Sequence, residues 1–362
     1  MKQGTNAAVM RIKNEKMILS LINLSPLSRV EISRITGLTR AAVTIITDEL
    51  LGRGLISEMP TRSAGVGRQP VLLYLNDQAF YTIGINISRE ETALGIADLG
   101  GNLVAEEKYP AMKPDAFFAE IGGLIRDMTA RCRIPQEKIY GVGVVTPGPV
   151  DAKEKRILNP PNFKAWHNVS VGEGLNSLGL EVFHENVANG VALAEKYFGA
   201  SKGVSSFMAL LVDTGIGSGM VINHELFEGT NEVGHTSIRY DGRQCECGNR
   251  GCLEKYAAIP ALLQGTGIPD WKTAVDRKDP VLEQEAEYLS TAITNINNLF
   301  HLQKIVLCGD LNYRPELITE LISQKVKERM LNKRELSVCA GKVESRVLAA
   351  CAVGVHHFYF FS

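Results

Sequence analysis

One histidine and three cysteines within eighteen residues constrain this chain more than any other feature of its sequence. His235 is followed after nine residues by Cys245, after one more by Cys247, and after a further four by Cys252. Glycines between the last two cysteines allow a backbone tight enough for three sulfur atoms to converge on one ion. An imidazole and three thiolates complete a tetrahedral Zn²⁺ set and leave no position for catalytic water. Ordinary buried cysteines are the alternative, but this spacing predicts a structural zinc site.

The residues around this cluster resemble the signature of the ROK family (repressors, open reading frames and sugar kinases). The signature reads Glu232-Val-Gly-His235, then Cys245-Glu-Cys247-Gly-Asn-Arg-Gly-Cys252-Leu-Glu254. The resemblance implies structural zinc on His235 and the three cysteines. It also implies a monosaccharide pocket lined by Glu232, His235 and Glu254. The chemistry agrees, because a carboxylate can accept two sugar hydroxyl protons while a metal-bound loop holds it still.

The charge distribution separates the amino-terminal segment from the rest of the chain. The 362 residues are enough for two or three domains, and an apolar content of 45% is typical of a globular protein. The formal net charge is only −1, but residues 1–78 carry ten Lys and Arg against six Asp and Glu. A basic segment before a mildly acidic body suggests an appended nucleic-acid module.

The other cysteines and the hydropathy pattern indicate the compartment. Four cysteines outside the cluster are scattered singly, which suits a reducing environment better than a disulfide framework. The sequence shows neither a signal peptide nor an apolar run of membrane-spanning length. We therefore expect a cytoplasmic protein with no membrane partner.

The amino-terminal segment has the pattern of a helix-turn-helix. Apolar residues at helical spacing predict a helix over 14–24, after an arm at 1–10 that lacks periodicity. A capping box from Ser28 to Glu31 begins a second helix. The chain then turns at a glycine, and Thr39 can cap a third helix.

Five residues of this segment are candidates for DNA contact. Thr39, Arg40 and Thr44 begin the third helix, where small residues allow close approach to a groove and arginine can contact guanine or phosphate. Two predicted strands then flank a glycine-rich loop that carries Arg62 and Arg68, as in the wing of a winged helix. ROK repressors place such a module before the sugar-binding body, whereas the kinases mostly lack it. The alternative is a three-helix protein-interaction module with a hairpin.

Strands alternate with helices through the rest of the chain and predict an α/β body. The resemblance implies the two-lobed, actin- and hexokinase-like ROK fold. We expect a winged helix-turn-helix domain at 1–78, a first lobe at 79–190 completed by a carboxy-terminal helix at about 340–362, and a second lobe at 191–339 that holds the zinc site. Gly148 and Asn162 lie in segments that match the family and are candidate secondary sugar contacts, although they could equally serve only to shape loops.

Three positions that handle ATP in the ROK kinases are altered. They are Asn86–Glu90 at the first phosphate loop, Val187 at the catalytic aspartate, and Cys308–Asp310 at the glycines that meet adenosine. Valine cannot accept a proton, so base catalysis is lost at that position. Asn186 remains as a candidate partner for a sugar hydroxyl, and the second phosphate loop near Thr214–Gly219 is largely retained.

The sequence therefore predicts a sugar-responsive transcriptional regulator, a repressor of carbohydrate-utilisation genes, that binds a monosaccharide without phosphorylating it. An inverted-repeat operator would match a homodimer or homotetramer. An active ATP-dependent ROK sugar kinase is the main alternative, and a zinc-stabilised scaffold without a ligand is a third. Val187 would leave the hydroxymethyl group of a hexose unpaired, which favours a neutral pentose such as xylose. A hexose 6-phosphate directed toward Thr214–Gly219 is the other possibility.

Overall fold

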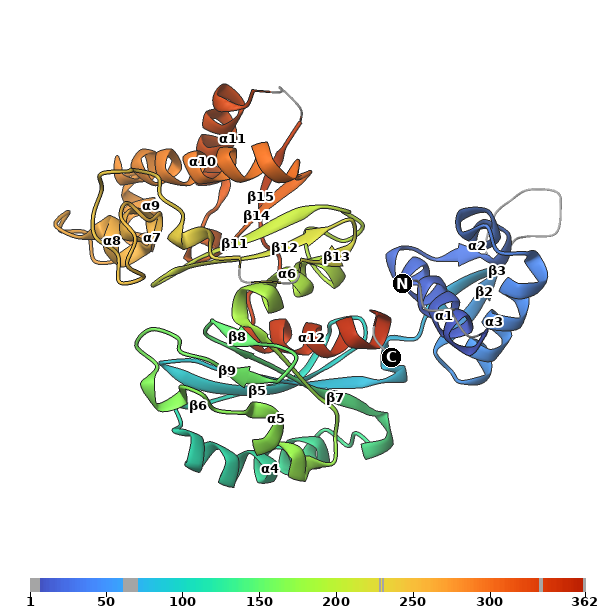
Figure 1. The fold of residues 1–362 in the computed structure, drawn as a ribbon. Helices are drawn as coiled ribbons and strands as arrows, with labels where there is room; N and C mark the ends of the chain where they lie inside the picture. The colour runs from blue at the N-terminus through green and yellow to red at the C-terminus, as the bar shows by residue number, and fades with distance from the viewer. Residues whose placement is uncertain (1–6, 61–70, 228, 230, 332–334, 361–362) are drawn as a thin grey trace.

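The computed structural model describes residues 7–60, 71–227, 229, 231–331 and 335–360. These residues form a small amino-terminal unit and two α/β lobes, drawn in Figure 1 in blue, in cyan to green, and in yellow to orange. No helix in the described part of the chain combines the length and the apolar character that crossing a membrane requires.

The amino-terminal unit has three helices and a small antiparallel sheet in the order β1-β3-β2. Its elements are α1 (Ala7–Leu24), β1 (Leu27–Ser28), α2 (Arg29–Thr36), α3 (Arg40–Gly52), β2 (Ile56–Pro60) and β3 (Val71–Leu75). The capping box is confirmed, since Ser28 accepts from the Glu31 amide and the Glu31 carboxylate accepts from the Ser28 amide. Thr39 caps α3 through the Ala42 amide at 3.2 Å. This order of elements is that of a winged helix.

The first helix begins earlier than the sequence predicts. It starts at Ala7, whereas we expected an arm to residue 10 and a helix from 14. Val9 and Met10 on the added turns are 52% and 45% exposed, so no buried apolar face marks them. High intrinsic helix propensity in a run of Ala, Met, Arg and Lys is enough to extend the helix there.

The first lobe is built on a five-stranded sheet. Its strands, in spatial order, are β10 (Val182–Asn186), β7 (Ile139–Thr146), β4 (Tyr81–Ile87), β5 (Glu91–Asp98) and β6 (Leu103–Pro110). Strands β4, β7 and β10 are parallel, and β4, β5 and β6 form an antiparallel meander. Helix α4 (Pro114–Arg131) shares an apolar core with one face of this sheet. Strand β6 was not predicted, because an edge strand with few buried residues carries little hydrophobic signal.

A short excursion leaves the first sheet between β7 and β10. It contains β8 (Val150–Asp151), β9 (Arg156–Ile157) and α5 (Val171–Gly174). The peptide bond between Gly148 and Pro149 at its start is cis. This segment carries both loops that we expect near a sugar.

The second lobe is built on another five-stranded sheet. Its strands, in spatial order, are β13 (Glu225–Leu226), β12 (Ile216–Ile222), β11 (Phe207–Val212), β14 (Lys304–Gly309) and β15 (Ser337–Ala340). This sheet is accompanied by helices α7 (Glu254–Ala257), α8 (Ile259–Leu263), α9 (Trp271–Arg277), α10 (Val281–Phe300) and α11 (Glu316–Arg329). We expected one helix over 256–266, but Pro260 lies at the start of α8 and Ala258 before it is extended. Proline cannot continue a helix hydrogen-bond ladder, so the segment divides in two.

Two buried helices, α6 (Val187–Tyr197) and α12 (Arg346–Phe360), pack against each other between the sheets (Figure 1). Helix α12 lies so close to the first sheet that a Cβ on Gly143 would be 1.9 Å from the Ala350 carbonyl oxygen. Helix α6 also lies close to the second sheet, since a Cβ on Gly219 would be 2.4 Å from the Ala188 carbonyl oxygen. The two helices therefore join the lobes.

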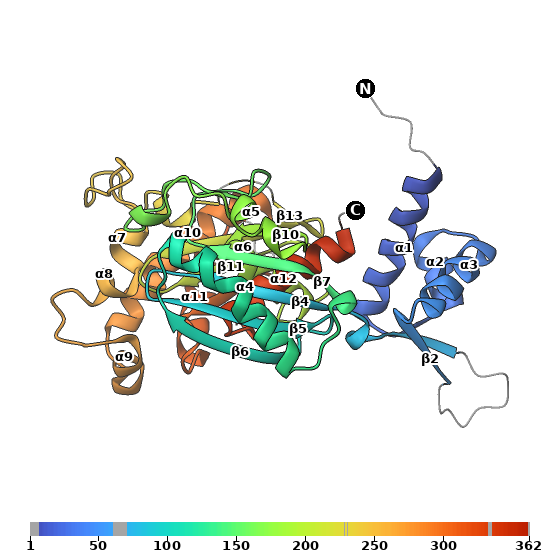
Figure 2. The same cartoon turned by 90° about the horizontal axis from the view of Figure 1, so that it is seen from below.

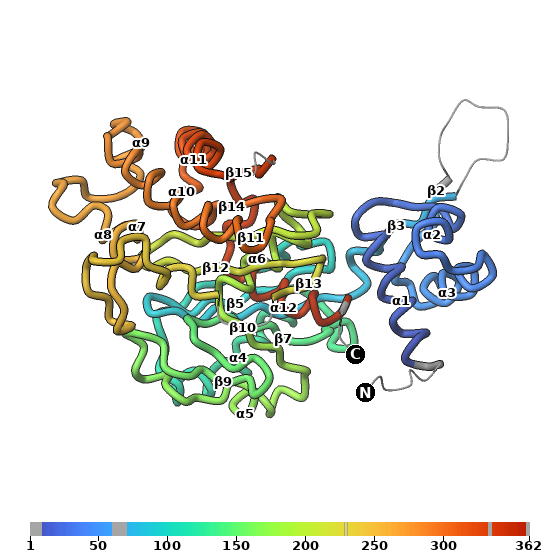
Figure 3. The backbone as a smooth tube through the Cα atoms, turned by 45° about the horizontal axis from the view of Figure 1, so that its top comes forward, coloured from blue at the N-terminus to red at the C-terminus, as the bar shows by residue number. Residues whose placement is uncertain are grey.

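The amino-terminal unit meets the body at the end of α12, as Figures 2 and 3 both show. Ile18 and Leu19 of α1 belong to the same buried cluster as Phe358 and Tyr359 of α12. The Lys16 ammonium also donates to the His357 carbonyl oxygen at 3.3 Å. The apolar core thus continues from the winged helix into the first lobe.

Candidate sugar site and metal centre

The four residues of the His/Cys cluster converge. All four ligand atoms lie within 4.8 Å of one another. The Cys247 and Cys252 sulfurs are 3.7 Å apart, and the Cys245 sulfur is 3.6 Å from His235 Nδ1. A zinc tetrahedron with Zn–S bonds of about 2.3 Å has S–S edges of about 3.8 Å, so the arrangement fits a metal ion of that size.

The loop that carries the cluster is fixed by its backbone. Gly251 has a φ of +69°, and a Cβ there would lie 1.6 Å from the Arg239 carbonyl oxygen, so only glycine fits. The Asn249 side-chain amide donates to the His235 carbonyl oxygen at 3.2 Å. His235 itself ends the short helix η5 (Val233–His235). These contacts hold the ligands in place from both ends of the loop.

Glu254 stands two residues after Cys252, at the first position of α7. Its Oε2 accepts a hydrogen bond from the Ile216 amide at 2.9 Å, and its carboxylate lies against Gly215. The metal loop and the glycine-rich turn before β12 are therefore tied together through this carboxylate. Glu232, at the start of η5, is exposed, and His235 is half-buried. The three predicted sugar-facing residues thus come from the segment that carries the His/Cys cluster.

Asn186 and Val187 lie where β10 meets α6. The Asn186 Oδ1 accepts from the Asn189 amide at 2.8 Å and caps α6, so this oxygen is already bonded. This capping role of Asn186 was not predicted, although an asparagine directly before a helix is a capping signal. The side-chain NH₂ of Asn186 is the part that can meet a sugar. Val187 is the first residue of α6 and is half-buried.

The start of α6 contacts elements of both lobes. A Cβ on Gly148 would be 3.4 Å from the Asn186 Cβ, and one on Gly217 of β12 would be 3.1 Å from the Ala188 Cβ. The turn at Gly148 and strand β12 therefore both pack against the first residues of α6. Asn162 is exposed on the neighbouring loop and has a φ of +55°.

Asp213, which directly precedes the Thr214–Gly219 segment, bonds residues that are distant in the sequence. Asp213 Oδ1 accepts from the Asp310 amide at 2.9 Å, and Asp213 Oδ2 pairs with Arg346 at 2.7 Å. Burial and the neighbouring Asp213 carboxylate raise the pKa of Asp310. The Asp213 carboxylate therefore occupies the Asp310 amide, and the nearby Asp310 carboxyl adds a group that disfavours an anion between these two turns. The link between Asp213 and Arg346 could not be read from the sequence.

Helix α3 presents an exposed face at its amino-terminal end. Thr39, Arg40 and Thr44 are all exposed there, beside Ile45, which is 59% exposed. Arg40 makes no ion pair within the described part of the chain. The predicted wing residues Arg62 and Arg68 lie outside the described residues.

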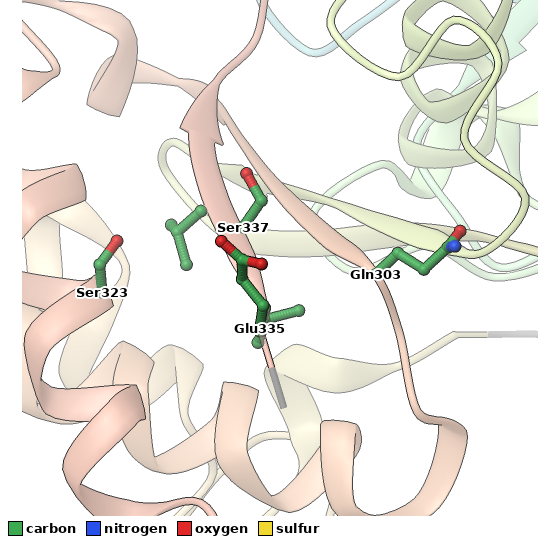
Figure 4. Close-up of a pocket in the computed structure, with 6 residues that line it drawn as sticks. Gln303, Ser323, Glu335 and Ser337 are labelled. Carbon is green, nitrogen blue, oxygen red and sulfur yellow. The ribbon is translucent and has the colours of Figure 1, made fainter. Parts of the chain in front are cut away.

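A separate hollow lies at the far edge of the second sheet. It is lined by Gln303, Ser323, Glu335 and Ser337 (Figure 4). Gln303 precedes β14, whereas the turn with Asp310 follows that strand, so the hollow is at the opposite end from the candidate site. None of the predicted sugar-binding residues lines it.

The fold and the site define a class of protein: a two-lobed α/β body with a His/Cys cluster, preceded by a unit of three helices and a small antiparallel sheet. The chain belongs to the ROK family, whose family model matches residues 82–356.

Among characterised proteins, the xylose repressor of Bacillus spizizenii is 29% identical over an alignment that covers 95% of each chain. The transcriptional dual regulator NagC of Escherichia coli is 27% identical, with 95% of this chain and 90% of that one covered. A solved ROK family transcriptional regulator, a homologue of the E. coli MLC protein, is 25% identical with a TM-score of 0.80 and 97% of both chains covered. A ROK glucokinase from Streptomyces griseus, solved with glucose and AMPPNP, shares the fold over 75% of this chain and 98% of its own, with a TM-score of 0.63 and 23% identity.

Proposed function

We propose that this protein is a sugar-responsive transcriptional repressor that binds operator DNA through α3 and a monosaccharide between its lobes, without phosphorylating the sugar. The observation that carries the proposal is Val187 at the head of α6, directly after Asn186 and between the contacts of this helix with the turn at Gly148 and with strand β12. A sugar hydroxyl there finds no base to deprotonate it. The winged helix, which shares its apolar core with α12, would bind DNA and so convert sugar binding into a change in transcription.

The alternative, an active sugar kinase, needs a phosphate site and a base. The contacts of Asp213 with Asp310 and Arg346 oppose the first, and Val187 opposes the second. The similarity along nearly the whole chain to a xylose repressor and to a transcriptional dual regulator supports the regulator. ATP-dependent phosphorylation of any common hexose or amino sugar by the purified protein would favour the kinase instead.

In this proposal His235, Cys245, Cys247 and Cys252 hold one structural Zn²⁺. The ion would supply rigidity, because four protein ligands leave no position for a reacting water. Its effect on the sugar is indirect. A fixed loop holds Glu232, His235 and Glu254 in place, and Glu254 has its Oε1 available to accept a sugar hydroxyl proton while Oε2 bonds the Ile216 amide.

The route from sugar to DNA would run along α6 and α12. The Tyr197 hydroxyl near the end of α6 hydrogen-bonds His356 Nδ1 of α12 at 2.8 Å. The next residue, His357, accepts from Lys16 of α1 through its carbonyl oxygen. A sugar that binds one arrangement of the two lobes better than another would thereby bias the placement of α1 and the winged helix. The operator would be an inverted repeat read by a homodimer or homotetramer.

Replacing Arg40 with alanine tests the DNA-binding part of the proposal. We expect operator binding to weaken by about 1–3 kcal/mol if Arg40 contacts a base. The operator is first selected from random duplex DNA with the wild-type protein, and affinities are then measured by fluorescence anisotropy at fixed salt. Arg126→Ala on the exposed face of α4 is the matched control and should leave binding unchanged. Failure to select any sequence at moderate salt would contradict DNA regulation.

Replacing Val187 with aspartate tests the predicted preference for a pentose. A buried hexose hydroxymethyl group against valine stays unpaired and costs about 1–3 kcal/mol. We expect Val187→Asp to improve D-glucose binding relative to D-xylose in titration calorimetry, because the carboxylate can accept a hydrogen bond from the hydroxymethyl hydroxyl of glucose. Val187→Ala is the control, since it removes the isopropyl group without adding an acceptor. If wild-type protein binds glucose 6-phosphate more tightly than any neutral sugar, the preference for a neutral pentose is wrong.

A further inference from the structure

The turn between β4 and β5 replaces the first phosphate loop of the kinases, and its amides are bonded within the turn. The Ser88 Oγ accepts from the Glu90 amide at 3.2 Å and from the Glu91 amide at 3.0 Å. The same hydroxyl donates to the Glu91 carbonyl oxygen at 2.9 Å. Backbone amides that could cradle an anion are therefore satisfied by one serine side chain. This leaves Arg89 at the tip of a closed hairpin.

Arg89 reaches from this tip to a distant loop. Its Nε and Nη2 both donate to the Pro161 carbonyl oxygen, at 3.1 and 2.7 Å. Pro161 immediately precedes Asn162, the candidate sugar contact with a left-handed backbone. Because two nitrogen atoms donate to one oxygen, they restrain both the orientation of the Pro161 carbonyl group and its distance from Arg89. The planar guanidinium group does this better than the single ammonium group of a lysine.

The loop has other anchors besides Arg89. The His167 ring nitrogen Nε2 lies 2.9 Å from the Pro160 carbonyl oxygen, at hydrogen-bond distance. Phe163 and Trp166 are buried, with their rings stacked 5.8 Å apart, and the Trp166 indole donates to the Met112 carbonyl oxygen at 3.2 Å. These contacts hold the base of the loop, whereas Asn162 at its tip is exposed. Arg89 is the side chain that bonds the carbonyl oxygen directly before Asn162, and it does so from the turn between β4 and β5.

We propose that Arg89 is a positioning residue for sugar binding, which holds the 160–166 loop and hence Asn162 in the sugar-binding geometry from the former phosphate loop. The inference rests on the proposed sugar-binding function and deepens it. In a kinase, the bound nucleotide can help to order the residues around the sugar. In this protein the turn between β4 and β5 would hold the 160–166 loop in place before any sugar binds. Less conformational entropy of the loop would then be lost when the sugar binds.

The test uses the full-length, zinc-loaded protein and two substitutions, Arg89→Ala and Arg89→Lys. Hydrogen exchange first measures peptides covering 158–168, where the Asn168 amide bonds the Leu158 carbonyl oxygen. We expect faster exchange in Arg89→Ala and an intermediate rate in Arg89→Lys. Arg131→Ala, which removes an exposed arginine paired with Glu107 on the same lobe, should leave this loop unchanged. Unchanged exchange in Arg89→Ala would overturn the proposal whether or not any sugar binds.

Titration with D-xylose and D-glucose then separates positioning from simple stability. We expect Arg89→Ala to weaken binding of the preferred sugar by about tenfold, with partial rescue in Arg89→Lys. Metal content, melting temperature and sugar-free operator affinity should stay at wild-type values. Unchanged sugar affinity in Arg89→Ala, or a loss confined to glucose 6-phosphate, would show that Arg89 does not position the loop for a neutral sugar. If wild-type protein binds no sugar while exchange changes as expected, the proposed function fails and the contact between Arg89 and Pro161 stands.

Discussion

Cys252→Ser should release the bound metal and abolish sugar binding. Cys252 is fully buried and lies 3.7 Å from the Cys247 sulfur, so it occupies one vertex of the ligand tetrahedron. A serine hydroxyl does not supply the thiolate that zinc requires. Structural zinc in small peptides contributes about 10–16 kcal/mol of apparent binding free energy, which is then lost to folding. Because Glu254 follows Cys252 by two residues, the sugar-facing carboxylate should lose its fixed position with the metal.

The measurements are metal content by mass spectrometry, thermal unfolding, and calorimetry with D-xylose. We expect one Zn²⁺ per wild-type chain and none in Cys252→Ser, with a lower melting temperature. Cys132→Ser removes a half-buried cysteine of the first lobe and is the matched control, which should keep metal and sugar binding. If wild-type protein stays fully folded and still binds sugar after a chelator has removed the metal, the metal has no structural role in the sugar site.

Gly143→Ala should destabilise the first lobe and displace α12. The added Cβ would lie 1.9 Å from the Ala350 carbonyl oxygen and 2.9 Å from its carbonyl carbon, and neither backbone atom can rotate away. Overpacking against backbone typically costs about 1–3 kcal/mol, and we expect the upper end of that range. Since α12 also contacts α1, the substitution should alter operator binding as well as stability.

Gly123→Ala on α4 is the control with the opposite expected sign. A Cβ there meets no heavy atom within 4 Å, and alanine is about 0.5–1 kcal/mol better than glycine inside a helix. Urea unfolding followed by circular dichroism measures both variants. If Gly143→Ala is as stable as the wild-type protein, the close contact between β7 and α12 is not real.

The local features of this protein could be predicted from its sequence. The His/Cys cluster could be predicted because its four residues lie within eighteen positions at a spacing that serves one ion. The capping box at Ser28 and the cap at Thr39 were predicted for the same reason, since a cap and its amide partner are three residues apart. The loss of the kinase base at Val187 also needed only one residue identity and the resemblance of its surroundings.

Contacts between residues far apart in the sequence became visible only in the folded protein. Arg89 bonds Pro161 across 72 residues, and Arg346 bonds Asp213 across 133. Glu254 bonds the Ile216 amide across 38. Two of these three contacts end on a backbone carbonyl or amide, which every residue except proline carries in full, so no side-chain pattern marks them. These residues meet because the two sheets pack around α6 and α12. That packing depends on the whole chain.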